Sequence, residues 1–282
     1  MRRTILVTLC LGSAMALSAC QKAADSEVDR AIQSVNAIDD NNLSDVMLTV
    51  ADPNEAVAYF KRTSAQSPDR IDLQRGLAGS LVRAKQYTEA SAAWSKVVGM
   101  PGSTTADKVE YADALVRAGK WEKAEQVLDT IAPTHETFKR YKLEAMIADG
   151  NKEWKKADSF YETAVGLTTK PASVLNNWGY SKLSRGDFRE AERLFGEAIQ
   201  YDPKLYTAKN NLILARGAQR NYQMPILDMT QTERAQLMHT LALTAIKHGD
   251  VSMGKSLLQD AIDTHPQHFE AAVHSLNALK GV

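Results

Sequence analysis

Apolar and polar residues recur along this chain with the spacing of packed α-helices. Small residues return about every 34 positions, and large apolar or aromatic residues lie three positions before or four positions after most of them. The recurring small residues are Ala56, Ala90, Ala124, Ala157 and Ala191. Residues three and four positions apart share one face of a helix, so each copy predicts an amphipathic helix. A fixed period of this length indicates a repeat array in which each unit buries its apolar face on its neighbours.

The clearest copy of the pattern spans residues 172–205. Its characteristic positions hold Leu175, Trp178, Gly179, Ala191, Phe195, Ala198 and Pro203. This arrangement resembles the tetratricopeptide repeat (TPR), a 34-residue pair of antiparallel helices. The resemblance implies an all-α fold, a right-handed superhelical solenoid of antiparallel helix pairs, and a role in binding partners. Small residues such as Gly179 and Ala191 would let the two helices of a pair approach closely.

Counting outward from this copy predicts an array of about six or seven units, because two of the seven candidates are degenerate. They span residues 37–70, 71–104, 105–137, 138–171, 172–205, 206–234 and 235–268. The first is degenerate, since it lacks the turn glycine. The sixth is degenerate too, because it is about five residues short and has Pro225 where a close-packing small residue is expected. Proline inside a helix costs about 3 kcal/mol, so we predict a break before the last repeat.

Local signals mark the starts of three helices. Asp52-Pro53 and Asp202-Pro203 each combine a capping carboxylate with a proline suited to the first turn, and Thr230 with Glu233 forms a capping box. Two further apolar stripes, within residues 20–36 and 269–282, predict helices that cap the array of residues 37–268 at its two ends.

The chain begins with a basic pair, Arg2 and Arg3, followed by a short apolar run and small residues. This pattern predicts a secretory signal peptide over residues 1–19, too short for a membrane-spanning helix. The last four residues, Leu17 to Cys20, resemble the lipobox of bacterial lipoproteins. The resemblance implies a covalent lipid on Cys20 and, with Gln21 next, an outer-membrane anchor facing the periplasm of a Gram-negative bacterium. An ordinary signal peptide cut after Ala19 is the alternative.

The composition of the chain bears on nucleic-acid binding and on disulfide bonds. The chain has 34 Lys and Arg against 34 Asp and Glu, and two of the cations lie in the leader, so 34 − 2 = 32 cations face 34 anions in the mature chain. A net charge of about −2 does not supply the basic field that nucleic-acid binding requires. The other cysteine, Cys10, would leave with the leader, so no disulfide is expected.

Catalytic chemistry has little support in the sequence. No zinc-protease, serine-hydrolase or phosphate-loop motif is found. His265 and His268 are close in sequence but have no cysteine partner, so we predict no metal site. We therefore expect a protein that is not an enzyme and needs no cofactor or small-molecule substrate. An enzyme with a site between repeats remains the competing class, and would require convergent titratable groups.

First helices of TPR units line the concave face, so partner contacts are expected there. Asn176-Asn177 recurs 34 residues later as Asn210-Asn211, and Arg83 recurs as Arg117. Asparagine offers a donor and an acceptor to a peptide backbone, and arginine suits a carboxylate. Tyr180 would add an apolar anchor on the same face. Alternatively, the asparagines are ordinary repeat residues and the arginines are charges favoured at helix C-termini.

The lipobox together with the repeats resembles the TadD family, the TPR lipoproteins of tight-adherence (Flp) pilus assembly. This resemblance implies a partner such as the pilus secretin or associated assembly subunits. Two other lipoprotein classes remain open, namely the repeat lipoprotein of outer-membrane β-barrel assembly and an adaptor for cell-wall hydrolases.

Overall fold

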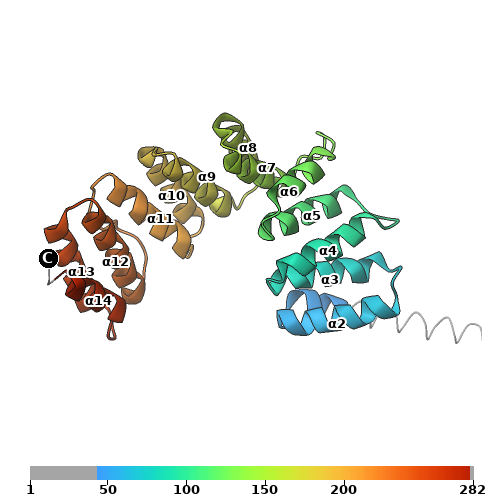
Figure 1. Cartoon of the computed structure of the whole chain (residues 1–282), viewed down its shortest axis with the longest axis horizontal. Helices are drawn as coiled ribbons and strands as arrows, with labels where there is room; N and C mark the ends of the chain where they lie inside the picture. Colours follow the sequence, from blue (N-terminus) through green and yellow to red (C-terminus); the bar gives the residue numbers. More distant parts are fainter. Residues whose placement is uncertain (1–42, 280–282) are drawn as a thin grey trace, which may run out of the picture. The chain divides into compact units, whose positions relative to one another are not determined.

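The computed structural model describes residues 43–279, and every regular element within them is an α-helix (Figure 1). The signal peptide, Cys20 and the predicted N-terminal capping helix lie outside the described residues. Among the described helices, none is both long and apolar enough to cross a membrane. The chain divides between Lys120 and Trp121 into two compact units.

The first unit holds five helical segments, each packed on the next along the chain. They are residues 43–49, α2 (Pro53–Gln66), α3 (Ile71–Arg83), α4 (Tyr87–Val98) and α5 (Thr105–Arg117). Tyr59, Phe60 and Leu73 form a core between α2 and α3. The α5 helix starts at a capping box in which Thr104 and Asp107 exchange hydrogen bonds. This satisfies N–H groups that the first turn of a helix leaves without partners.

In the second unit, too, each helix packs on the next helix along the chain. Its elements are α6 (Trp121–Asp129), α7 (Phe138–Gly150), α8 (Trp154–Gly166), α9 (Ala172–Ser184), α10 (Phe188–Tyr201), α11 (Tyr206–Ala218), α12 (Gln231–Lys247), α13 (Val251–Thr264) and α14 (Glu270–Ala278). The pair α9 and α10 lies in close contact because Gly179 faces the ring of Phe195. A Cβ at this glycine would lie 2.7 Å from a ring carbon, so the prediction of close packing at Gly179 is confirmed.

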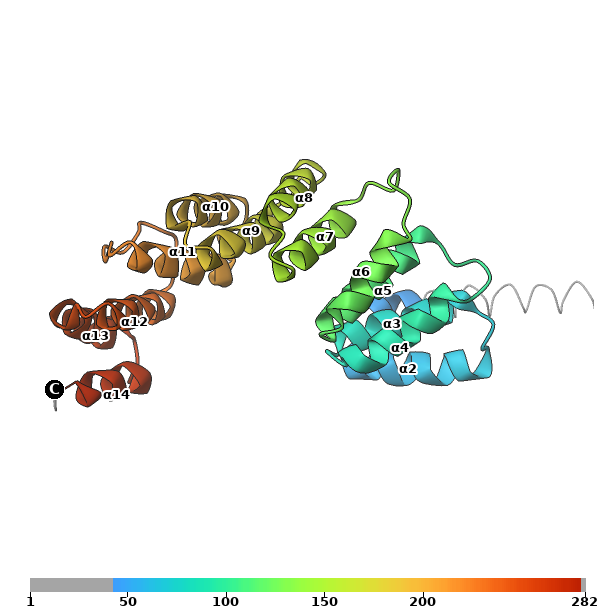
Figure 2. The same cartoon turned by 45° about the horizontal axis from the view of Figure 1, so that its top comes forward.

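The predicted sixth unit has only one helix. Between α11 and α12 the chain runs without helix through residues 219–230, which we call the strap (Figure 2). Pro225 lies in its middle, at the place where the sequence predicts a break. Leu227 packs against the core of α9 to α11, while Met224 and Met229 pack against the core of α12 to α14. The strap therefore fills the place of the missing second helix.

Two predicted helix starts are found and one is wrong. The Asp52 carboxylate accepts hydrogen bonds from the first turn of α2, and Thr230 with Glu233 forms the capping box of α12. Asp202, however, ends α10, and its carboxylate accepts from the backbone N–H of Lys204 at 3.0 Å. The bond makes a turn, so α11 starts only at Tyr206.

The last described helix, α14, follows the predicted apolar stripe. Ala272 is buried, and Phe269, Leu276 and Leu279 pack beside it on the core of α12 and α13. His239 of α12 reaches Ser275 of α14 at 3.1 Å. The α14 helix therefore packs on the α12–α13 pair, and its role as a capping helix stays a prediction.

Candidate partner-binding groove

A groove of about 610 Å³ runs across the first helices of three successive pairs in the second unit. Asparagines and aromatic residues dominate its walls. The lining residues are Trp121, Met146, Asp149, Gly150, Trp154, Tyr161, Asn176, Asn177, Tyr180, Ser181, Ser184, Tyr206, Thr207, Asn210 and Asn211. The structure thus brings together five of the seven residues that the sequence suggested as partner contacts.

The four asparagines are connected to neighbouring helices by their own side-chain amides. Asn211 of α11 donates from Nδ2 to Oδ1 of Asn176 in α9, at 3.0 Å. One repeat further, the Thr240 hydroxyl of α12 donates to Oδ1 of Asn210, also at 3.0 Å. In the other direction, Asn177 approaches the Met146 sulfur of α7 through Nδ2, at 3.4 Å. These contacts link four helices across the floor of the groove.

The contacts also fix which end of each amide is left for a ligand. Asn176 and Asn210 use their oxygens within the chain, so their NH₂ groups remain as donors. Asn177 and Asn211 use their NH₂ groups, so their oxygens remain as acceptors. Each pair therefore presents at least one donor and one acceptor. A polypeptide backbone offers the complementary set of C=O and N–H groups.

Aromatic side chains border the asparagines. Tyr180 is 58% exposed and Trp121 is 42% exposed, which is unusual for large apolar residues and leaves contact area for a partner. Trp154 and Tyr206 also line the groove, and the guanidinium of Arg185 lies 5.3 Å from the Trp154 ring centre. Trp121 and Trp154 lie three positions before Ala124 and Ala157 in the repeat pattern, and the pattern alone did not reveal their position on the groove.

Charge in the groove is limited to one carboxylate. Asp149 accepts hydrogen bonds from the Tyr161 hydroxyl at 2.9 Å and the Ser181 hydroxyl at 2.6 Å, so its charge is already solvated by the protein. Burial and the neighbouring Asp149 raise the pKa of Tyr161, which stays protonated and keeps donating. Lysine and arginine are absent from the lining. The groove therefore suits an uncharged segment better than an anion.

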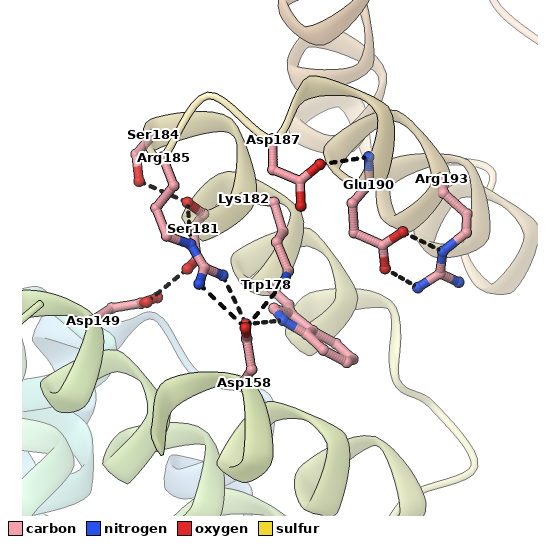
Figure 3. Close-up of polar contacts among 10 residues, drawn as sticks. All are labelled: Asp149, Asp158, Trp178, Ser181, Lys182, Ser184, Arg185, Asp187, Glu190 and Arg193. Carbon is pink, nitrogen blue, oxygen red and sulfur yellow. Dashed lines mark hydrogen bonds and ion pairs between the residues drawn. The ribbon is translucent and has the colours of Figure 1, made fainter. Parts of the chain in front are cut away.

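A partly buried ion cluster holds α9 against α8 beside the groove (Figure 3). Asp158 of α8 accepts from Trp178 Nε1 at 2.7 Å, from Lys182 at 3.0 Å and from two nitrogens of Arg185 at 2.7 and 3.2 Å. Burial would raise the pKa of Asp158, but the hydrogen bonds from Arg185, Trp178 and Lys182 prevail and lower it to about 2. Asp158 thus stays ionised and positions the helix that carries Asn176, Asn177 and Tyr180.

The other two predicted contact residues, Arg83 and Arg117, belong to the first unit and have partners inside it. Arg83 donates to the carbonyls of Met47, Leu48 and Ala51 at 2.7 to 2.9 Å. These carbonyls end the helix of residues 43–49, where a cation is favoured. Arg117 pairs with Asp113 at 3.0 Å and lies over the ring of Tyr87. Neither side chain lines the groove. The Arg117 side chain is 45% exposed, and a partner contact there stays a prediction.

Titratable residues do not assemble into a metal site within residues 43–279. No group of three His, Cys, Asp or Glu side chains with ligand spacing occurs there. His265, one of the pair considered in the sequence, instead stacks on Phe269 and contacts the carbonyl of Gln267.

Comparison with known families supports the repeat assignment. Residues 176–223, which carry the four asparagines, match the tetratricopeptide repeat family model. The fold is that of a TPR solenoid. A chain of the APC/C hetero-tetramer Cut9–Hcn1 superimposes with a TM-score of 0.59 at 15% identity, over 78% of this chain and 45% of that one. This chain therefore spans less than half the length of that structure.

Two bacterial TPR structures match over nearly their full length. A TPR protein from Parabacteroides merdae has a TM-score of 0.56 at 13% identity, covering 84% of this chain and 95% of that one. The C-terminal part of a TPR protein from Cytophaga hutchinsonii has a TM-score of 0.52 at 14% identity, covering 82% and 97%. No curated protein matches by sequence. TPR arrays are in general protein-interaction scaffolds that use extended concave surfaces.

Proposed function

We propose that this chain is an outer-membrane-anchored scaffold whose groove holds an uncharged segment of a partner protein during assembly of a tight-adherence pilus apparatus. The observation that carries the proposal is the groove of the second unit, in which Asn176, Asn177, Tyr180, Asn210 and Asn211 lie together. Their oriented amides suit a polypeptide backbone, and the exposed aromatic rings suit apolar side chains.

The pilus assignment and the anchor rest on the sequence. The lipobox ending at Cys20 and the resemblance to TadD lipoproteins point to the pilus secretin or associated subunits as partners. An adaptor role in outer-membrane protein assembly or for cell-wall hydrolases uses the same groove chemistry with a different partner. The identity of the captured protein therefore separates these functions.

In-cell photo-crosslinking from position 180 tests the groove. A photoreactive phenylalanine at Tyr180 should crosslink to the pilus secretin or a pilus subunit, detected by immunoblot. Tyr201 is a matched control, because it is 61% exposed but lies on α10 and does not line the groove. Capture of a hydrolase or of a β-barrel assembly component would replace the pilus function. Equal crosslinking from both positions would contradict the proposal that the partner binds in the groove.

The anchor has a separate test. Cys20→Ser should move the protein from the outer-membrane fraction to the soluble periplasmic fraction, because the thiol that carries the lipid is gone. A variant protein that still sediments with outer membranes would refute the lipid anchor without affecting the groove.

A further inference from the structure

We infer that the partner segment extends beyond the groove, over α11 to α12, and carries two apolar residues about six positions apart, one on Tyr180 and one on Leu243. The inference rests on the proposed function, because it describes the same segment that the groove holds. It starts from a pattern of side-chain contacts. Three helices, α9, α11 and α12, each use two neighbouring side chains to contact the helices on either side.

The pattern begins at the asparagine pairs of the groove. On α9, Asn176 contacts α11 and Asn177 contacts α7 in the opposite direction. On α11, Asn210 contacts α12 and Asn211 contacts α9. In both helices the first residue of the pair thus faces the following helix and the second residue faces the preceding one.

The same arrangement recurs on α12, which does not line the groove. His239 contacts the Ser275 hydroxyl of α14 through Nε2 at 3.1 Å. Its neighbour Thr240 donates to Asn210 of α11 at 3.0 Å. His239 and Thr240 therefore occupy on α12 the two places that the asparagine pairs occupy on α9 and α11.

An apolar side chain follows each of the three pairs. Tyr180, Leu214 and Leu243 lie four and three positions after the two residues of their pair. Residues at these separations share one face of a helix, so each apolar side chain lies between the contacts to the two neighbouring helices. Tyr180 is 58% exposed, Leu214 is half-buried and Leu243 is 45% exposed. We call these three side chains the apolar row.

Helix α12 is fixed beside α11 although the second helix of the sixth unit is missing. Lys209 of α11 is 2% exposed, and its Nζ donates to the carbonyl of Asp228 in the strap at 2.7 Å and lies 3.5 Å from the Glu233 carboxylate of α12. Gly217 of α11 lets Thr244 of α12 come close, since a Cβ there would lie 2.5 Å from a side-chain carbon of that threonine. The apolar row therefore continues onto a helix that packs directly on α11.

The spacing of the helices sets the spacing of residues in the segment. Helix α9 packs on α11 and α11 packs on α12, and the axes of packed helices lie about 8–10 Å apart. Two such steps span about 16–20 Å, which an extended chain covers in about five or six residues at about 3.3 Å each. Side chains of an extended chain point to the same side only at even separations. The apolar residues that contact Tyr180 and Leu243 are thus about six positions apart.

Photo-crosslinking from two positions, followed by mass spectrometry of the crosslinked peptides, tests the inference. A photoreactive phenylalanine at Tyr180 or at Leu243 of the full-length chain in cells should capture the same protein. The two crosslinks should lie in one segment of it, about six residues apart. Met253 is a matched control, because it is 45% exposed, as Leu243 is, but lies on α13, and it should not capture that segment.

A synthetic peptide covering the captured segment then measures what Leu243 contributes. Fluorescence anisotropy with the purified full-length chain should show about fivefold weaker binding to Leu243→Ser, because an apolar contact is lost. Leu243→Met and Met253→Ser should bind the peptide like the parent chain. All three variants should keep the melting temperature of the parent, since both side chains are exposed.

The outcomes separate this inference from the proposed function. Capture from Tyr180 alone, capture of different proteins, or crosslinks in separate segments of one protein would overturn the inference and leave the groove proposal standing. A second copy of this chain captured at Leu243, or unchanged peptide binding by Leu243→Ser, would do the same. Absence of capture from Tyr180 would overturn the proposed function and, with it, the inference.

Discussion

Helices α9 and α11 both open a repeat, but only α9 is followed by a second helix. In the fifth unit, Phe195 of α10 is 0% exposed beneath Gly179. Thirty-four residues later, Met229 of the strap is only partly buried, yet it still packs on the next core. The inward apolar positions of a repeat can therefore keep their place in the core even where the backbone is not helical.

The largest effect on stability is expected when the inward side chain is removed from the fifth and from the sixth unit in turn. Phe195→Ala should lower the free energy of unfolding by about 3–5 kcal/mol, because it leaves a cavity in a fully packed core. Met229→Ala, the matched change in the strap, should cost less than about 2 kcal/mol, since its side chain is partly exposed. Urea unfolding followed by circular dichroism measures both. Equal losses would show that strap and helix contribute alike to the core.

Lys209 provides the next largest effect. Lys209→Met keeps the length of the side chain but leaves the Asp228 carbonyl without its donor, at a cost of about 1.5–3 kcal/mol. Hydrogen exchange should also become faster in the strap than in α10. A variant with unchanged stability would mean that Leu227 and Met229 hold the strap without help from Lys209.

Asp158 supports the fifth unit and gives a pH-dependent test. Its pKa falls from 3.8 to about 2 in the folded chain, so its contribution is fully present above the unfolded value and is lost as the pH drops toward 2. After allowance for its partial exposure, Asp158→Asn should cost about 1–2 kcal/mol at pH 7. The gap between parent and variant in urea unfolding should narrow between pH 5 and pH 2.5. A gap that stays constant would contradict an ionic role.

The smallest effect is expected at Pro225. Pro225→Ala should change stability by less than about 1 kcal/mol and add no helix, because the sixth unit is also short and the contacts of Lys209 and Leu227 remain. The helical signal in far-ultraviolet circular dichroism reports this directly. A gain in ellipticity would identify the proline, rather than the missing residues, as the cause of the strap.

The sequence predicted the helical repeats well because their determinants are local. Close-packing positions such as Gly179 and caps such as Thr230 act within one or two helices, and a 34-residue period makes them visible. The same period correctly predicted that Asn176 and Asn211 lie on one surface. The period could not reveal that their amides bond to each other, since this depends on how two side chains orient in space.

The repeat pattern did not predict three features of the structure. Arg83 had the spacing of a contact residue, but its guanidinium donates to carbonyls at the end of the helix of residues 43–49. Asp202-Pro203 has the composition of a helix start and forms a turn instead. Asp158 shows no motif at all, because its three donors come from a helix about 20 to 27 residues away.

The bond between Asn176 and Asn211 has an evolutionary consequence. Replacing one of these asparagines leaves the amide of the other without its hydrogen-bond partner. A second substitution, at the other position, can restore the hydrogen bond only if the two new side chains match. Related chains should therefore exchange these two residues together rather than singly. If so, the ligand preference of two neighbouring repeats would be inherited as one unit.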